Sequence, residues 1–144
     1  MQAALNFGHC RHQHTIRFKL TPLLVFVLLS PGIDGGGWTL VRRVKAGATW
    51  HPATDHLSGS EPAYGTYSED PTTDDSFGVP FENMDYDQFL FATGDAQIWL
   101  IADKEQVQEQ FGGPTQRQIV MSSTNPTPYT AAWYNRAGNR EDPW

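Results

Sequence analysis

The sequence predicts an α+β fold, with a mainly antiparallel sheet, short helices and long loops. Apolar and polar residues alternate over residues 38–44, which is typical of a half-buried strand. Residues 96–102 are apolar on both faces, as expected for a central strand. Helix-start signals stand at Asn83 and at residues 103–106. Strands mixed with short helices in this order favour the α+β class.

Length and charge exclude several kinds of protein. The 144-residue chain has the length of one domain, and 39% of its residues are hydrophobic, so it can bury a core. Residues 38–144 carry seven basic and fifteen acidic residues, which argues against nucleic-acid binding. The single cysteine, Cys10, lies ahead of the predicted domain, so a disulfide framework or a Cys-based zinc site is excluded within it.

Residues 1–32 are interpreted as a leader outside the domain. Residues 20–29 (LTPLLVFVLL) follow Arg17 and Lys19 and match the apolar core of a signal peptide. They are too few to span a bilayer, which needs about 20 apolar residues. Cleavage after Gly32 would free Ile33 and predicts a secreted protein. Two alternatives stay open: sequence that is foreign to the mature protein, as in a gene-model artefact, or a buried part of the fold.

The domain is predicted to begin with a glycine turn and a strand. Gly35, Gly36 and Gly37 stop any helix and permit backbone angles that other residues avoid. The alternation that follows places Trp38, Leu40, Arg42 and Val44 on one side, and Thr39, Val41, Arg43 and Lys45 on the other. Arg42 and Arg43 are expected to pair with acidic residues at the sheet surface.

Strands and helices alternate in the rest of the prediction. A long polar loop covers residues 45–76. Residues 77–81 form a short extended piece, and Pro80 restricts it to the edge of a sheet or stands at the end of the strand. A helix is expected to start at Asn83, with Asp85 and Asp87 in its first turn, and to end at residues 93–95. The remaining predicted elements are a strand over residues 96–102, a short helix from residue 103, and strands over residues 117–122 and 129–134.

Several segments resemble a known family. Residues 34–40 (DGGGWTL) are similar to the opening motif of fibrinogen C-terminal-like domains and of the related intelectin lectins. Residues 50–56 (WHPATDH), 84–95 (MDYDQFLFATGD) and 132–135 (AWYN) resemble a divergent, cysteine-free branch of fibrinogen-related sequences. The resemblance implies that residues 33–144 are the N-terminal part of a fibrinogen-like domain, truncated at its C-terminus.

The resemblance also implies a function. It predicts a secreted, lectin-like, carbohydrate-binding module that recognises glycans or acetylated groups on cell surfaces and is not an enzyme. A complete domain of this family would allow calcium, but no calcium ligand can be carried over to this sequence. No cofactor is expected, and the acidic charge and the short apolar run predict neither a nucleic-acid partner nor a transmembrane segment. The alternatives are an incomplete gene product without independent activity and a metal-dependent hydrolase.

The hydrolase alternative depends on one loop. His51, Asp55 and His56 carry side chains that bind zinc and related metals. Their spacing matches no metal signature, and Pro52 argues against a helix that would bring both histidines to one face. A structural loop, anchored by Trp50 and His51, is the favoured interpretation. Trp50, His51, Asp55 and His56 are the weak ligand-binding candidates, and neither a catalytic nor a metal-binding residue is assigned.

Two further groups have a functional and a structural interpretation. Residues 69–75 hold four carboxylates, which are suitable calcium ligands, but the pattern is not an EF-hand, and a solvated acidic loop is favoured. Aromatic residues could form a platform for sugars, since aromatic rings stack on apolar sugar faces. Aromatic residues at the spacing of a strand are more often part of the core. The residues concerned are Trp99, Tyr129, Trp133, Tyr134 and Trp144.

Overall fold

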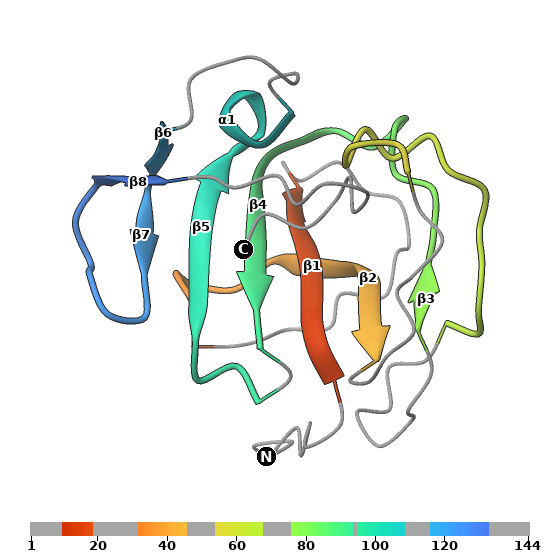
Figure 1. Cartoon of the computed structure of the whole chain (residues 1–144), viewed down its shortest axis with the longest axis horizontal. Helices are drawn as coiled ribbons and strands as arrows, with labels where there is room; N and C mark the ends of the chain where they lie inside the picture. The colour runs from red at the N-terminus through yellow and green to blue at the C-terminus, as the bar shows by residue number, and fades with distance from the viewer. Residues whose placement is uncertain are drawn as a thin grey trace.

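The computed structural model describes residues 10–18, 32–45, 54–67, 76–93, 95–108 and 116–132 (Figure 1). Strands account for most of the regular structure in these residues. In chain order the elements are β1 (Cys10–Phe18), β2 (Trp38–Lys45), β3 (Phe77–Gly78), β4 (Tyr86–Ala92), β5 (Trp99–Asp103), α1 (Lys104–Gln108), β6 (Gln116–Ile119), β7 (Met121–Ser122) and β8 (Tyr129–Ala132).

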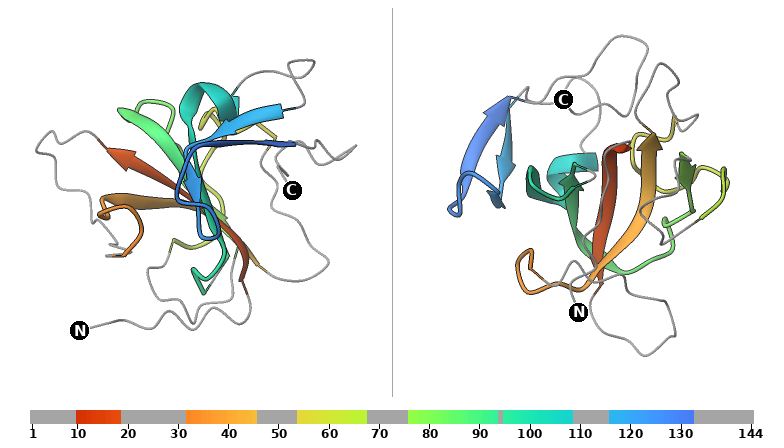
Figure 2. Two further views of the ribbon diagram at one scale, coloured as in Figure 1. Left: turned by 90° about the vertical axis from the view of Figure 1, so that its left-hand side faces the viewer. Right: turned by 90° about the horizontal axis from the view of Figure 1, so that it is seen from below.

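The strands form two antiparallel sheets. The larger has six strands in the order β3-β2-β1-β4-β5-β7, and the smaller pairs β6 with β8. The chain passes from one sheet to the other at Val120, whose N–H donates to the carbonyl of Ile101 at 2.8 Å. Figure 2 shows β8 set off from the larger sheet on the side of β5.

The predicted α+β class is wrong, because the described residues are mainly antiparallel β-structure with one helix of five residues. The error lies in the helix predicted after Asn83, where the chain instead forms strand β4. Asn83 belongs to a turn in which the N–H of Met84 donates to the carbonyl of Phe81 at 3.0 Å. The polar residues that suggested a helix start therefore serve a turn that leads into a strand.

Strand β4 buries consecutive residues on both of its faces. Phe89 and Phe91 lie in one core cluster, whereas Leu90 and Ala92 lie in the other. This alternation needs a covered sheet, because a helix would turn consecutive side chains by about 100° rather than to opposite sides. β1 and β5 flank β4 and pair with its backbone, so the aromatic stretch is a central strand.

The two clusters are the cores on the two sides of β4. The first includes residues from β2, β4, β5, α1 and β6, together with Leu57 and Phe81 from loops: Val41, Leu57, Phe81, Tyr86, Phe89, Phe91, Ala102, Val107 and Ile119. The second is smaller and consists of Ile33, Trp38, Leu90, Ala92 and Ile101. Loop residues thus complete the first core, and this positions the polar loop described below.

The glycine turn before β2 has the predicted role. Gly35, Gly36 and Gly37 have φ angles of 76°, 80° and 83°, a region that favours glycine. The N–H of Gly36 and the indole Nε1 of Trp38 both donate to the carbonyl of Ile33 at 3.0 Å. The turn therefore fixes Trp38, which is fully buried, at the start of β2.

Strand β2 departs from the predicted alternation at a β-bulge. Thr15 of β1 pairs with Leu40, but His14 pairs with Arg42, so Val41 is the extra residue. Val41 belongs to the first core, and the guanidinium of Arg42 lies 5.1 Å from the ring centroid of Phe81 in the same core. A bulge changes which face the following side chains meet. Arg42 therefore lies on the face of the sheet that carries the first core, although the sequence predicted a position at the sheet surface.

Strand β1 lies within the segment interpreted as a leader. It pairs with β2 on one side and β4 on the other, which is the place that a structured part of the fold would take. The apolar run of residues 20–29, on which the signal-peptide interpretation depends, is outside the described residues. The proposed division into residues 1–32 and 33–144 stays a prediction.

The other predicted elements agree more closely with the structure. α1 begins directly after Asp103 and buries Val107, as the capping signal predicted. The strands predicted over residues 96–102 and 117–122 appear as β5 and as β6 with β7, and β8 falls within the predicted 129–134. Within the described residues, no helix is long and apolar enough to cross a bilayer.

Candidate functional site

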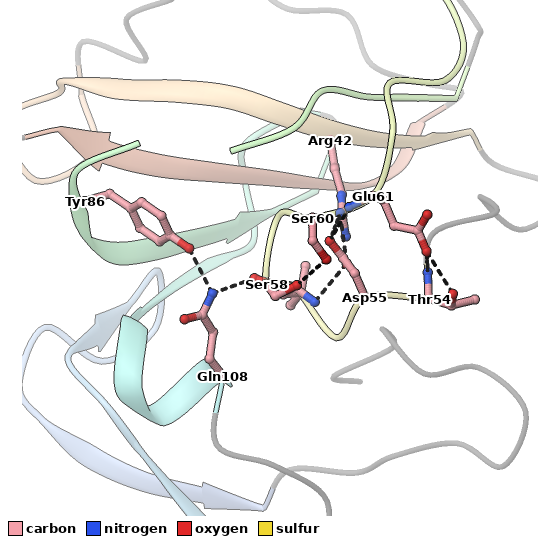
Figure 3. Close-up of polar contacts among 9 residues, drawn as sticks. Arg42, Thr54, Asp55, Ser58, Ser60, Glu61, Tyr86 and Gln108 are labelled. Atoms are coloured by element: carbon pink, nitrogen blue, oxygen red, sulfur yellow. Dashed lines mark hydrogen bonds and ion pairs between the residues drawn. The ribbon is translucent and has the colours of Figure 1, made fainter. Parts of the chain in front are cut away.

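The polar loop of residues 54–61, called the 54–61 loop below, is the part of the predicted site that the structure describes. Its apolar side chain, Leu57, is buried and packs into the first core. Figure 3 shows the loop between β2, which supplies Arg42, and α1, which supplies Gln108. The loop is therefore fixed to the sheet at one side and to the helix at the other.

Asp55 fixes the loop to β2. Nη2 of Arg42 lies 2.9 Å from Oδ1 and 2.8 Å from Oδ2 of Asp55 (Figure 3). The N–H of Leu57 donates to Oδ1 at 3.2 Å, and the N–H of Glu61 donates to Oδ2 at 3.0 Å. A carboxylate has about four lone-pair positions, and these contacts use them within the protein. The two side chains are 1% and 4% exposed, so the ion pair is buried.

The backbone of the loop turns sharply after Asp55. His56 and Leu57 have φ angles of 55° and 62°, in the left-handed region that costs a residue with a Cβ roughly 1–2 kcal/mol. The N–H of Ser58 donates to the carbonyl of Asp55 at 3.1 Å and closes this turn. The hydrogen bonds to the Asp55 carboxylate offset the strain by holding the chain on both sides of it.

The ends of the loop are joined by Glu61. Its Oε1 accepts hydrogen bonds from the N–H of Thr54 at 2.9 Å and from the hydroxyl of Thr54 at 2.8 Å. Because Asp55 also accepts from the N–H of Glu61, the two carboxylates cross-link the beginning and the end of the loop. The 54–61 loop is thus held in one shape by its own residues.

Gly59 joins the loop to the turn before β4. Its carbonyl accepts from the N–H groups of Phe81 and Glu82 at 3.0 and 3.2 Å. A Cβ at this position would lie 2.6 Å from the backbone nitrogen of Glu82 and from the Phe81 ring. With a φ of 85°, the position therefore requires glycine for both conformation and space.

Gln108 fixes the other side of the loop to α1 and β4. Its Nε2 donates to the carbonyl of Leu57 at 2.7 Å and to the hydroxyl of Tyr86 at 2.9 Å (Figure 3). Burial raises the pKa of Tyr86 to about 12, and the hydrogen bond from Gln108 acts in the opposite direction. Lys104 lies 4.0 Å from the centroid of the Tyr86 ring, in a cation–π contact.

The structure separates the candidate residues that the sequence grouped together. Asp55 is buried against Arg42, whereas His56 is exposed. Trp50 and His51 lie outside the described residues. In the part of the chain that the structure describes, no three His, Cys, Asp or Glu side chains are placed to hold a metal ion. The geometry thus gives Asp55 a role in building the loop.

The other predicted groups are only partly described. Trp99 is half-buried against the second core, and Tyr129 packs against the first, as the structural interpretation expected. Trp133, Tyr134, Trp144 and the carboxylates of residues 69–75 lie outside the described residues. Tyr67, an aromatic residue of the long polar loop, is 41% exposed and meets the buried Phe77 edge-on at 5.2 Å.

The residues that shape the loop from a distance are not evident from the sequence. The strand pattern predicts a surface ion pair for Arg42, and no pattern marks Gln108 or Tyr86. Gln108 reaches the carbonyl of Leu57 across 51 positions in the chain, and no local pattern signals such a contact. Asp55 does have a weak local signal, because Ser58, Gly59 and Ser60 follow it after two residues, and Asp, Ser and Gly are common in hydrogen-bonded turns.

Comparison of the chain with protein-family models, with curated proteins and with solved structures found no significant match. The similarity to fibrinogen-related domains stays a prediction based on the segments quoted above.

Proposed function

We propose that this chain is an extracellular, non-catalytic recognition module of the lectin type, and that it binds glycans through the exposed polar groups of the 54–61 loop. The observation that carries the proposal is the use of the Asp55 carboxylate. Its oxygens bind Arg42 and two backbone N–H groups. Asp55, the carboxylate of the group considered for metal binding, therefore stabilises the loop instead of presenting a free carboxylate.

The outer surface of the loop supports the proposal. Thr54, His56, Ser58 and Ser60 are exposed. The hydroxyls of Ser58 and Ser60 are 2.9 Å apart and lie next to each other on one short turn (Figure 3). Hydroxyl and imidazole groups form hydrogen bonds with sugar hydroxyls. A loop that is already held in shape loses little conformational entropy when it binds, and this favours recognition.

The class of ligand comes from the resemblance alone. Fibrinogen-related domains and intelectins suggest glycans or acetylated surface groups, with calcium in complete domains. The predicted signal peptide suggests secretion. N-terminal sequencing of the protein from its source tests this part: a chain that starts at or near Ile33 supports export, whereas a chain that starts at Met1 contradicts it.

A glycan array probed with the full chain, with and without calcium, tests recognition. A ligand found there should bind Ser58→Ala/Ser60→Ala about tenfold more weakly, since each hydrogen bond contributes about 0.5–1.5 kcal/mol. Ser123→Ala is the control outside the 54–61 loop. Ser123 is an exposed residue between β7 and β8. Its hydroxyl accepts a hydrogen bond from the N–H of Trp99 at 3.3 Å, so the control also removes a hydroxyl that has a partner within the protein. Absence of any bound glycan, or equal losses for the two variants, would overturn the proposal.

The two alternatives have separate tests. A metal-dependent hydrolase needs bound metal, so elemental analysis of the purified full chain should find a metal that is lost in His51→Ala/His56→Ala. The engaged Asp55 oxygens make the geometry less favourable for this alternative. An incomplete gene product without independent activity predicts a chain that fails to fold, and amide hydrogen exchange would detect this as uniformly fast exchange.

A further inference from the structure

Strand β1 connects two parts of the larger sheet. β3 and β2 lie on one side of it, and β4, β5 and β7 lie on the other. β1 is antiparallel to both β2 and β4, so these two strands run parallel to each other on either side of it (Figure 1). Each edge of β1 is therefore used, and its place in the sheet is defined by two ladders.

The position in the sheet between β2 and β4, which β1 fills, has the features of a binding site for an extended peptide. Neighbouring strands lie about 4.8 Å apart, so β2 and β4 are separated by about twice that distance. Their facing edges offer backbone N–H and C=O groups that a strand between them satisfies. The register is also defined: Ile16 stands opposite Thr39 and Phe89, and Thr15 stands opposite Leu40 and Leu90.

The residues of β4 that border this position belong to the two cores. Phe89 and Phe91 belong to the first core, and Leu90 and Ala92 belong to the second, so the strand between β2 and β4 is bordered by apolar side chains on both sides. In recognition by strand addition, backbone hydrogen bonds supply affinity and the pockets for alternating side chains supply specificity. An occupant with the sequence of β1 fits the register that the sheet already has.

The connection from β1 to β2 is long for an antiparallel pair. Residues 19–37 separate Phe18 from Trp38, whereas hairpin loops usually have 2–5 residues. At about 3.3–3.6 Å per residue, the thirteen residues before the glycine turn, residues 19–31, can reach roughly 45 Å when extended. Among the described strands β1 comes first, and its exchange requires the connection to β2 to pass to the other molecule.

We propose that the place between β2 and β4 accepts β1 of a second copy of this chain, which produces a strand-exchanged dimer. Each place in the dimer contains the same backbone ladders as in the single chain, because the exchanged element is identical. The equilibrium then depends on protein concentration and on the entropy of the long connection. The inference does not depend on the proposed glycan binding, but it requires a chain that keeps residues 10–18, so a chain starting at Ile33 would overturn it. A dimer would present two 54–61 loops and strengthen binding by avidity.

The single cysteine allows a direct test with full-length chains. Cys10 is the backbone partner of Lys45 on β2, and partners in antiparallel strands lie about 4.5–5.5 Å apart, within the range for a disulfide. Native chains are unfolded together with Cys10→Ser/Lys45→Cys chains, refolded at several concentrations and oxidised. Exchange places the Cys10 segment of a native chain beside the introduced thiol of the other chain, so mass spectrometry should find a disulfide between the two chains.

The control uses Cys10→Ser/Glu105→Cys, which places the thiol at an exposed position on α1. We expect the interchain disulfide to form several times more often with Lys45→Cys than with Glu105→Cys, and to increase with protein concentration. Equal amounts of cross-linking in the two mixtures, or none with Lys45→Cys, would overturn the proposal.

A second measurement avoids any variant that fails to fold. Unlabelled and ¹⁵N-labelled native chains are refolded together and examined by native mass spectrometry, where a dimer of intermediate mass is expected. Only monomers at every concentration would contradict strand exchange even if the variants could not be used.

Discussion

The guanidinium of Arg42 binds both carboxylate oxygens of Asp55 through its Nη2 atom, at 2.9 and 2.8 Å, in a buried ion pair. This pair joins β2 to the 54–61 loop. It forms because the bulge at Val41 directs Arg42 to the side of the sheet where Phe81 and Leu57 pack. The shape of the loop, and with it the proposed recognition surface, therefore depends on a feature of β2.

Replacing Asp55 should destabilise the protein strongly. Asp55→Asn keeps the shape of the side chain but removes the negative charge that faces the buried Arg42 guanidinium, and breaking a buried ion pair typically costs about 3–5 kcal/mol. The free energy of unfolding, measured by urea denaturation, should fall by this amount. Asp95→Asn is the control, since Asp95 is exposed and its carboxylate serves only a turn with Thr93 and Gln97. Similar losses for the two variants would mean that the ion pair does not hold the loop.

Two glycines with positive φ should respond differently to alanine. Gly59 and Gly35 have φ angles of 85° and 76°, so both variants should lose roughly 1–2 kcal/mol of stability from backbone strain. Gly59→Ala should lose more, because its Cβ would also meet Glu82 and Phe81, whereas nothing lies within 4 Å of a Cβ at Gly35. Urea midpoints with unchanged m-values would show the difference. A larger loss for Gly35→Ala would contradict the described packing of the loop.

Tyr86 should make stability depend on alkaline pH. Burial raises its pKa from 10.0 to about 12, so between these values the unfolded chain has lost the phenol proton while the folded chain keeps it. The folded state then binds more protons, and the free energy of unfolding falls as pH rises from about 10 to about 12. Tyr86→Phe should remove this part of the fall, measured by urea denaturation across that range. An unchanged pH dependence in the variant would show that Tyr86 titrates as an exposed tyrosine.

The assignment of β4 to a central strand can be tested with a buried and an exposed residue. Phe89 is fully buried, so Phe89→Ala should lower the free energy of unfolding by about 3–5 kcal/mol. Ile98 is 63% exposed in the turn before β5, and Ile98→Ala should change stability by no more than about 0.5 kcal/mol. Chemical denaturation of both variants measures the contrast. A comparable loss at Ile98 would mean that this end of the sheet is covered.

The error at β4 shows where sequence patterns are insufficient. The four consecutive buried residues of β4, from Phe89 to Ala92, suit either a buried helix or a strand that is covered on both faces. The polar residues before them suit either a helix start or a turn. The ladders with β1 and β5 decide between these structures, and they join segments that are distant in the sequence.

The sequence by itself determined the features that depend on neighbouring residues. The glycine turn, β2, β5 and α1 follow from backbone freedom at glycine, from alternation and from a capping signal, and each of these acts within a few positions. Tertiary structure alone decided the roles of Asp55 and Gln108. Their partners, Arg42 and Leu57, lie 13 and 51 positions away, and the bonds form only when the bulge and the sheet bring these residues together. The physical reason is that a buried carboxylate or amide is stable only where the fold supplies its partners.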